Sequence, residues 1–349
     1  MPSLPLQGDL KGLNTKKMSV FSYLILNSLD AAGNLAAEQV IFDTLPRGES
    51  CFLLWQNRSA VVIGRHQDAL AEIDRAFVEE NGIQLVRRIS GGGAVYHDLG
   101  NLNYSVITDA RGSKAPDMAV FCEPVLRLLQ RLGVPAELSG RNDMTVHGQK
   151  FSGSAQHLYK GRVLHHGTLL IDSDLNMVTR ALRVDPEKIR SKGLASVRSR
   201  VTNLRPFLPE EVDLPRFRAL LLHEVLAEHP GEELSLSREQ LREIEALSES
   251  RYRSWDWTVG VSPPCSLIRR QRFEGCGTVE ARLQVEHGRI AALSFRGDFF
   301  SAEEPEALAE RLLGLPLEPE ALSAVLEQTE VSRFFLGLSK EQLFSLLFR

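Results

Sequence analysis

The chain has 349 residues, of which 43% are apolar and 25% are charged, and its formal net charge is −4. This composition is typical of one large globular domain or of a large domain and a small one. A general nucleic-acid binder normally carries a basic charge balance, so this composition argues against that class, and no nucleic-acid partner is expected. No run of about 18 uncharged apolar residues is present, so neither a membrane span nor a membrane partner is expected.

Residues 1–18 contain Pro, Gly and Lys and lack the apolar core of a secretory signal, so they are expected to form a flexible lead-in. The cysteines form no C-x-x-C pair, which argues against a zinc knuckle or a thioredoxin-like site. They are Cys51, Cys122, Cys265 and Cys276. A reducing compartment fits this usage, so the expected location is the cytoplasm, or the mitochondrial matrix if the source is eukaryotic.

The first part of the chain predicts alternating helices and strands without regular βαβ repetition. Residues 31–46 are expected to form a helix with Asn34 as a candidate N-cap. Residues 68–82 predict one helix that ends at Gly82. Apolar runs predict buried strands at 51–56, 59–65 and 102–108, and a strongly periodic helix is predicted at 116–134.

The second part predicts a pair of strands over 149–159 and 162–172, joined by a turn near Lys160–Gly161. A tight turn near His147–Gly148 precedes them. Two helices are expected around 209–228 and 236–251, and a hairpin that turns at His287–Gly288 is expected over 277–297. The Pro263–Pro264 pair is the best candidate for a linker, so a small α+β unit is expected to follow it.

Three consecutive glycines, Gly91 to Gly93, lie in the segment VRRISGGGAVYHDLGN. Such a run costs conformational entropy unless it has a use. Bare backbone lets a ligand approach closely and leaves N–H groups free to bind oxyanions. Arg88 lies just upstream and is able to hold a phosphate in a bidentate way. An ordinary surface hairpin explains this segment equally well when it is taken alone.

Lys150 lies in a predicted strand beside Ser152 and Gly153, small residues that permit close approach of a ligand. A lysine on that surface would set a positive charge against a ligand anion, whereas a strand-edge lysine that points to water is the alternative. His165 and His166 are adjacent on a strand and therefore point to opposite faces, so only one of them is able to face a pocket. A half-buried histidine with a satisfied hydrogen bond is the simpler explanation for either one.

Between Arg180 and Arg205 there are eight basic and two acidic residues. This surplus suits a nucleotide polyphosphate or an acidic protein partner. A solvated basic loop is the alternative.

Taken together, these segments resemble the lipoate–protein ligase family. RRISGGGAVYHDLGNLN, GRND, KFSGSA, HHGTLL and KGLASVRSRVTNL follow one another in that family's order and spacing. The resemblance covers roughly residues 20–349. It implies an α+β fold: a biotin-ligase-like catalytic domain with a mixed sheet, related to class II synthetases, over 19–261. A small α+β accessory domain over 262–349 would follow, as in the two-domain bacterial enzymes.

The resemblance implies two half-reactions. Lipoate and ATP, with Mg²⁺, first give lipoyl-adenylate and pyrophosphate. The acyl group then passes to a lysine ε-amine of a lipoyl domain. The implied partners are lipoyl domains of 2-oxoacid dehydrogenase acyltransferase subunits and the glycine-cleavage carrier protein.

The alternative is an octanoyl- or lipoyltransferase of the same fold that uses a preformed acyl donor. The ligase-like transferase carries a cysteine where this chain has Asn142 and Asp143. A non-catalytic lipoate binder is a third possibility, against which Lys150 argues.

The resemblance also implies roles for individual residues. Lys150 would be the catalytic residue, bonding the carboxylate and the α-phosphate, and Asp143 the Mg²⁺ ligand. Apolar contact with the acyl tail is expected from Val61, Val62, Ile63 and Val95. The residues expected to bind lipoate or the adenylate are Arg88, Ser90, Gly91, Gly92, Gly93, Ala94, His97, Asn101, Asn142, Ser152, Gly153, His166, Gly167 and Arg198.

Five further expectations concern the pocket and its cover. Arg88 would lie at the phosphate, and His165 would replace His166 if the strand register were shifted by one. Bulk at Gly91–Gly93 would push the loop off the adenylate. The basic segment Lys188–Arg200 would close over the adenine and ribose and exclude water, and the C-terminal unit would move to admit the acceptor domain.

Overall fold

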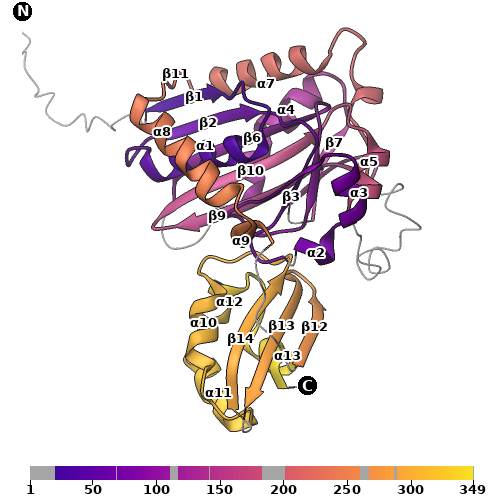
Figure 1. Cartoon of the computed structure of the whole chain (residues 1–349). Helices are drawn as coiled ribbons and strands as arrows, with labels where there is room; N and C mark the ends of the chain where they lie inside the picture. Colours follow the sequence, from indigo (N-terminus) through magenta and orange to yellow (C-terminus); the bar gives the residue numbers. More distant parts are fainter. Residues whose placement is uncertain are drawn as a thin grey trace, which may run out of the picture.

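The computed structural model of the chain describes residues 20–67, 69–110, 117–140, 142–182, 201–259, 267–286 and 289–348. Several predictions lie outside the described residues: the lead-in 1–18, Arg198 with the segment Lys188–Arg200, the Pro263–Pro264 linker, the turn His287–Gly288, and the domain boundary between residues 261 and 262. The described residues form an α+β fold with a mixed sheet and a smaller C-terminal unit, as predicted (Figure 1).

The large sheet has eight strands and a mixed character. In spatial order they are β11 (Glu232–Glu233), β1 (Phe21–Ile25), β2 (Ser50–Trp55), β6 (Asn101–Asp109), β10 (Arg162–Leu170), β9 (Gln149–Tyr159), β8 (Asp143–Val146) and β7 (Ala136–Ser139). Strand β1 pairs in parallel with β2 and β11, whereas β2, β6, β10, β9, β8 and β7 pair antiparallel in turn. The predicted turn at Lys160–Gly161 is confirmed, since both residues have positive φ.

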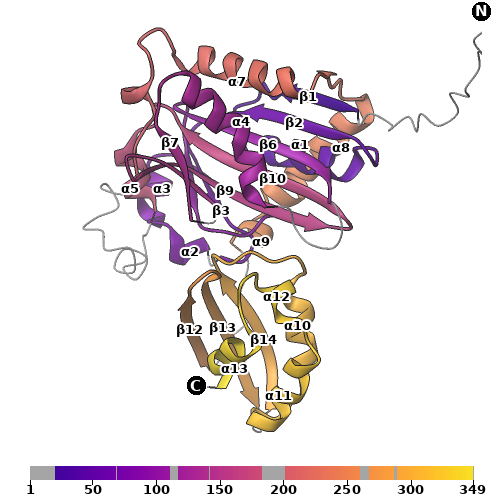
Figure 2. The ribbon, with the colours of Figure 1, turned by 180° about the vertical axis from the view of Figure 1, so that it is seen from behind.

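One face of the large sheet is covered by α4 (Met118–Arg131) and α7 (Leu214–Glu228) (Figures 1 and 2). Because side chains alternate along a strand, Phe52 and Leu54 of β2 pack against this layer. Cys51, Leu53 and Trp55 pack on the opposite face.

The opposite face is covered by α1 (Ala31–Thr44), α8 (Arg238–Leu247) and a small sheet. The small sheet has the order β4 (Gln84–Arg87), β3 (Ala60–Ile63) and β5 (Val95–His97). The prediction of Asn34 as the N-cap of α1 was wrong. Asp30 caps the helix by accepting from Gly33 N at 2.7 Å. Asn34 lies one turn further along and is buried, because its side chain ties α1 to the backbone of Ser28.

The single helix predicted over 68–82 was also wrong. The structure has two short helices there, α2 (Ala69–Glu72) and α3 (Arg75–Glu80). The break occurs because Ile73 forms a β-bridge with Leu182 and the Asp74 carboxylate accepts from Phe77 N at 3.1 Å. Gly82 follows α3 with φ +59°, which is the conformation expected of a glycine after a helix end.

The remaining elements before the C-terminal unit are short: α5 (Leu175–Ala181), a 3₁₀ turn (Arg205–Phe207), a π-helical turn (Ser248–Tyr252) and α9 (Trp255–Thr258). Within the described ranges no helix is both long and apolar enough to cross a membrane.

The C-terminal unit is a three-stranded antiparallel sheet packed by helices (Figure 2). Its strands are β12 (Leu267–Phe273), β13 (Gly277–Glu286) and β14 (Arg289–Gly297), and its helices are α10 (Pro305–Leu312), α11 (Pro319–Glu327), α12 (Val331–Phe334) and α13 (Lys340–Phe348). The predicted pairing of the strands in 277–297 is confirmed. The unit has its own core, in which Phe335 packs edge-on against Phe295 and Phe299.

Candidate active site

A cavity of about 110 Å³ lies between the large sheet and the small sheet. Its apolar walls are Leu35 of α1, Trp55 of β2, Val62 of β3, and the residues Ala94, Val95 and Ala155. Its polar lining comes from Arg88, His97, Asn103, Asn142, Lys150, Ser154, His166 and Thr168. An apolar slot with a few polar groups suits a ligand that has a long apolar tail and a charged head.

The predicted apolar contacts divide according to strand alternation. Val62 and Val95 line the cavity. Val61 and Ile63 do not, because odd positions of β3 point to the opposite side. Both are fully buried in a separate cluster with Phe77 of α3. The expectation that Val61 and Ile63 contact the acyl tail was therefore wrong.

Lys150 lies in the wall of the cavity. Its Nζ lies 2.6 Å from Asp143 Oδ1, and its side chain is 26% exposed. A Cβ added to Gly153 would lie 2.7 Å from the same Nζ, so a side chain at residue 153 would push the lysine ammonium from this position. The predicted tight turn at His147–Gly148 is confirmed by positive φ at both residues, and it returns the chain from β8 to β9.

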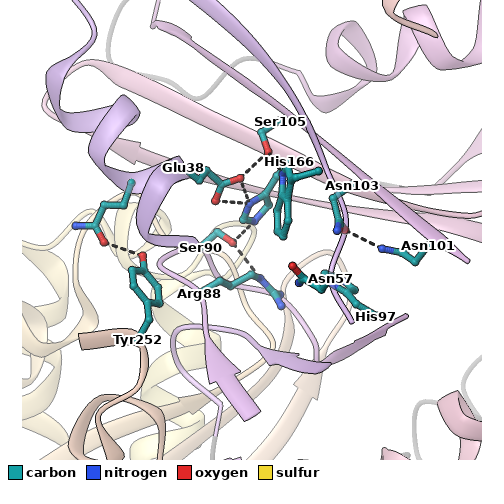
Figure 3. Close-up of polar contacts among 12 residues, drawn as sticks. Glu38, Asn57, Arg88, Ser90, His97, Asn101, Asn103, Ser105, His166 and Tyr252 are labelled. Carbon is teal, nitrogen blue, oxygen red and sulfur yellow. Dashed lines mark hydrogen bonds and ion pairs between the residues drawn. The ribbon is translucent and has the colours of Figure 1, made fainter. Parts of the chain in front are cut away.

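A second polar group is built around His166, which lies between Glu38 and Ser90 (Figure 3). His166 Nδ1 is 3.0 Å from both Glu38 oxygens, and His166 Nε2 is 2.6 Å from Ser90 Oγ. Ser105 donates to the same Glu38 carboxylate at 2.6 Å, and Trp55 donates to Ser105 Oγ at 2.9 Å. This network fixes the cavity wall, since all its members are buried.

Sequence reasoning missed Glu38. A usable signal was present, because Glu38 lies three residues after Leu35 and three before Ile41, in the buried stripe of α1. An acid within an apolar stripe needs a buried partner.

His166 faces the cavity and His165 faces away, as the unshifted register predicted. His165 stacks on Phe121 at 4.8 Å in the α4 layer and lies 3.4 Å from Tyr104 Oη. Burial lowers the pKa of His165 to about 3, so it is neutral at physiological pH.

Arg88 holds the glycine loop in shape. Its guanidinium donates to Val62 O at 3.1 Å, to Gly91 O at 2.7 Å and to Gly93 O at 2.8 Å. It also donates to Ser90 Oγ at 3.0 Å. Burial lowers the pKa of Arg88 to about 10, which leaves it charged at neutral pH. The role predicted for Arg88 at the phosphate stays a prediction. In the structure, Arg88 holds the backbone of the glycine loop through these hydrogen bonds.

The glycines of the loop differ in what surrounds them. A Cβ on Gly91 would lie 2.3 Å from Phe299 O of the C-terminal unit. Gly92 has φ +93° and donates to Phe299 O at 3.2 Å. A Cβ on Gly93 would meet nothing within 4 Å among the described atoms. Gly91 is therefore required by the contact with the C-terminal unit, and Gly93 borders open space.

The predicted catalytic, binding and metal residues that the structure describes fall into two groups. Those that line the cavity are Arg88, Gly92, Gly93, Ala94, His97, Asn142, Lys150, Gly153, His166 and Gly167. Those that do not line it are Ser90, Gly91, Asn101, Asp143 and Ser152. In the second group, Ser90, Asn101 and Asp143 each contact a lining residue. Ser152 is buried with no partner for its hydroxyl among the described residues.

Comparisons with known proteins agree with this arrangement. Residues 30–226 match the family described as "Lipoyl protein ligase A/B catalytic domain", and residues 262–347 match "Bacterial lipoate protein ligase C-terminus". The chain is 39% identical to lipoate–protein ligase 1 of Staphylococcus aureus, covering 92% of this chain and 98% of that protein. It is also 39% identical to the lipoate–protein ligase LplJ of Bacillus subtilis, with the same coverage.

Two solved structures have similar folds. A Plasmodium falciparum LipL1 in complex with lipoate has a TM-score of 0.75 at 22% identity, covering 94% of this chain and 98% of that one. A lipoate–protein ligase A bound with ATP has a TM-score of 0.62 at 27% identity, covering 70% of this chain and 100% of that one. The fold and the family matches define an acyl-group ligase. The chain belongs to the lipoate–protein ligase family.

Proposed function

We propose that this protein activates lipoate with MgATP to lipoyl-adenylate and then transfers the lipoyl group to a lysine ε-amine of a lipoyl domain. The observation that carries the proposal is the position of Lys150. Its ammonium group stands at the wall of an apolar cavity, beside a glycine that leaves it room. A fatty acid in that cavity would present its carboxylate to this cation.

In the first step, a carboxylate oxygen of lipoate attacks the α-phosphorus and pyrophosphate leaves. Negative charge builds on the phosphoryl oxygens, and a positioned cation stabilises it. Lys150 now pairs with Asp143 at 2.6 Å. Because ATP brings phosphate oxygens of its own, the ammonium would shift from Asp143 toward substrate in the loaded enzyme.

Asp143 is the proposed Mg²⁺ ligand. A hard ion of this kind is held by one or two carboxylates together with substrate phosphates. The Asp143 carboxylate pairs with Lys150 of the cavity wall, and Asn142 also lines the cavity, with its amide nitrogen donating to Ser154 O at 2.9 Å. The two residues fit such a minimal ligand set, and the ion would arrive with ATP.

The proposed acceptors are lipoyl domains of 2-oxoacid dehydrogenase acyltransferase subunits and the glycine-cleavage carrier protein. For the acceptor lysine to reach the acyl carbon, the C-terminal unit is proposed to move. Its described contacts to the large domain combine polar pairs, such as Gly297 N to His66 O at 2.6 Å and Arg65 to Glu304 at 3.1 Å, with packing of Phe300 against Met118 and Ala155. A cytoplasmic location stays a prediction.

The experiment is an assay of pyrophosphate release and of mass-detected lipoylation of both acceptor types, with and without ATP. Release that needs lipoate, followed by addition of one lipoyl group, supports the ligase. Transfer from an acylated carrier without ATP would instead support the transferase.

That rival needs a thiol nucleophile at the cavity. Burial raises the pKa of Cys122, and this thiol packs between Tyr104 and Ser154 in the α4 layer. No cysteine lines the cavity in the part of the chain that the structure describes.

A further inference from the structure

We infer that His97 and Asn103 form a donor pair that binds one oxygen of the acyl substrate's carboxyl group. This inference rests on the proposed function and adds a site within the cavity. His97 is 2% exposed and Asn103 is 1% exposed, and both line the cavity. His97 Nε2 and Asn103 Nδ2 are buried atoms with no hydrogen-bond partner among the described residues.

The proton on His97 is placed by a chain of hydrogen bonds from α1. The Asn34 side-chain nitrogen donates to the backbone oxygens of Ser28 and Gln56, at 2.9 and 2.8 Å. Two carbonyl acceptors identify that atom as the amide nitrogen. It also lies 2.9 Å from Asn57 Oδ1; an amide nitrogen in that place would set two donor groups against each other, so the other end of the Asn57 amide is its nitrogen.

Asn57 Nδ2 lies 3.0 Å from His97 Nδ1 and donates to it, so His97 Nδ1 carries no proton. Burial and the charges of Arg88 and His166 lower the pKa of His97 to about 3, so the ring is neutral. A neutral imidazole with a bare Nδ1 carries its proton on Nε2. His97 therefore presents an N–H donor to the cavity.

Asn103 contributes the second donor. Its Oδ1 accepts from Asn101 Nδ2 at 2.9 Å, which leaves its amino group as the unpaired end (Figure 3). A buried donor without a partner costs stability, so its presence beside a cavity indicates a ligand acceptor. Two unpaired donors in the wall of one cavity indicate that an oxygen atom of the ligand lies there, and not its hydrocarbon tail.

Strand register places this pair on the side of the cavity where Lys150 lies. Asn103 of β6 pairs with Thr168 of β10. Thr168 Oγ1 in turn lies 3.4 Å from Gly153 N, and Gly153 lies against Lys150 Nζ. The His97 ring lies 6.0 Å from the ring of Trp55, and Trp55 of β2 is the register partner of Asn103 of β6. Lys150 and the donor pair are thus close neighbours in the lining of the cavity.

One oxygen of the acyl carboxyl group would be stabilised by these two donors in both half-reactions. In the acid it carries half of the carboxylate charge, and in the acyl-adenylate it is the carbonyl oxygen. When the acceptor amine attacks the carbonyl carbon, the C=O electron pair moves onto this oxygen. The oxyanion then collapses, AMP leaves with the C–O bonding pair, and the amine nitrogen releases a proton to solvent. Donors fixed in a water-poor cavity stabilise that charge most in the transition state.

The test uses the full-length protein with His97→Phe, Asn103→Leu and the rescue variant His97→Gln, which keeps an N–H donor. Tyr96→Phe is the matched control: Tyr96 is the neighbouring residue on β5, packs in the cluster away from the cavity, and loses one hydroxyl. Pyrophosphate exchange and transfer from synthetic acyl-adenylate are measured with both lipoate and octanoate.

Each donor deletion is expected to lower kcat by about 10²–10³-fold in both half-reactions, with KM for ATP nearly unchanged. His97→Gln should recover part of the rate, and Tyr96→Phe should match the unmodified protein. Octanoate has no ring sulfurs, so equal losses with both acids place the pair at the carboxyl group. A loss with lipoate alone, or a change in KM alone, would overturn the inference.

A second measurement does not depend on catalysis or on the variants folding. In ¹⁵N-histidine-labelled protein near pH 7, His97 should show a bare Nδ1 and a protonated Nε2, and octanoate should shift Nε2–H. The opposite tautomer, or titration near the ordinary pKa of histidine, would refute it. If the unmodified protein forms no adenylate yet shows this shift, the proposed function fails while the carboxyl site stands.

Discussion

The large sheet and the C-terminal sheet are both packed by helices, yet they bury different side chains. Around the cavity, the large domain buries Glu38, Arg88, His97, Asn103 and His166. In the C-terminal unit, the described residues bury only the polar side chains Thr278 and Thr329, and the core is built from Phe and Leu.

Burying polar groups costs free energy unless each has a partner. A domain that concentrates them therefore indicates a site, whereas an apolar core indicates a unit that acts through its surface. The surface that matters here is the Phe299–Phe300 segment, which packs on Gly91 and Gly92. We propose from this contrast that the large domain carries the chemistry and that the C-terminal unit controls access to the cavity, and four predictions test that division.

The largest expected effect is loss of adenylation in Lys150→Ala. Removing one positioned donor from a developing oxyanion lowers the rate by about 10²–10³-fold. Pyrophosphate release with lipoate and ATP measures it. Lys340→Ala is the control from the C-terminal unit, because Lys340 pairs with Glu327 on the surface. An unchanged adenylation rate in Lys150→Ala would contradict the assignment of the chemistry to the cavity of the large domain.

Next comes the pair Gly91→Ala and Gly93→Ala. A methyl at residue 91 would overlap Phe299 O at 2.3 Å, so overpacking should destabilise the contact with the C-terminal unit by about 1–3 kcal/mol. Gly93 borders open space, so Gly93→Ala should leave unfolding unchanged and raise KM for substrate. Urea unfolding and steady-state kinetics separate the two effects. Equal behaviour of the two variants would contradict the assignment of Gly91 to the domain contact.

Local patterns predicted the parts of this fold that local forces decide. The paired strands around Lys160–Gly161, the turn at His147–Gly148 and the outward and inward faces of His165 and His166 all follow from alternation and turn chemistry. The resemblance of several motifs added the glycine loop and Lys150. Those residues do meet around one cavity or directly behind it.

Other features depend on partners far away in the chain, and local patterns do not contain them. The break between α2 and α3 needs Leu182, and the buried position of Asn34 needs Ser28, Gln56 and Asn57. Glu38 finds its partners, Ser105 and His166, 67 and 128 residues further on. Gly91 is constrained by Phe299 in another unit, so the reason for that glycine was not available from the loop's own sequence.

A third prediction concerns acid stability. Burial lowers the pKa of His97 and His165 to about 3 and of His157 to about 4, and it lowers the pKa of His66 well below its usual value. Between pH 6.5 and 4 the unfolded chain therefore binds more protons than the folded one. Stability is complete above the unfolded pKa and falls as the pH drops, by about 1.4 kcal/mol per pH unit for each histidine.

His165→Phe should reduce the slope of the unfolding free energy against pH by the contribution of one proton. The variant should fold, because the ring faces the α4 layer and a phenyl ring fits the stack on Phe121. Urea unfolding at pH 8 and at pH 5 measures the slope, and comparing the slopes cancels any constant packing change. All four of these histidines lie before residue 260, so the acid loss should appear in the large domain. An unchanged slope in the variant would mean that His165 is protonated in the folded state.

The smallest effect is expected at the ion pair that joins the two units. Arg65 Nη2 lies 3.1 Å from Glu304 Oε2, with side chains 26% and 47% exposed. Exposed pairs contribute about 0–1 kcal/mol, and salt screens them. Glu304→Gln should therefore change unfolding little at low salt and not at all at high salt. Glu303→Gln is the matched variant, because Glu303 pairs with Arg333 inside the C-terminal unit. If the ion pair across the units holds the C-terminal unit in place, only Glu304→Gln should increase the radius of gyration that X-ray scattering measures for the free protein. The same profile for both variants would mean that the Phe299 contact with the glycine loop, and not this ion pair, sets the position of the C-terminal unit.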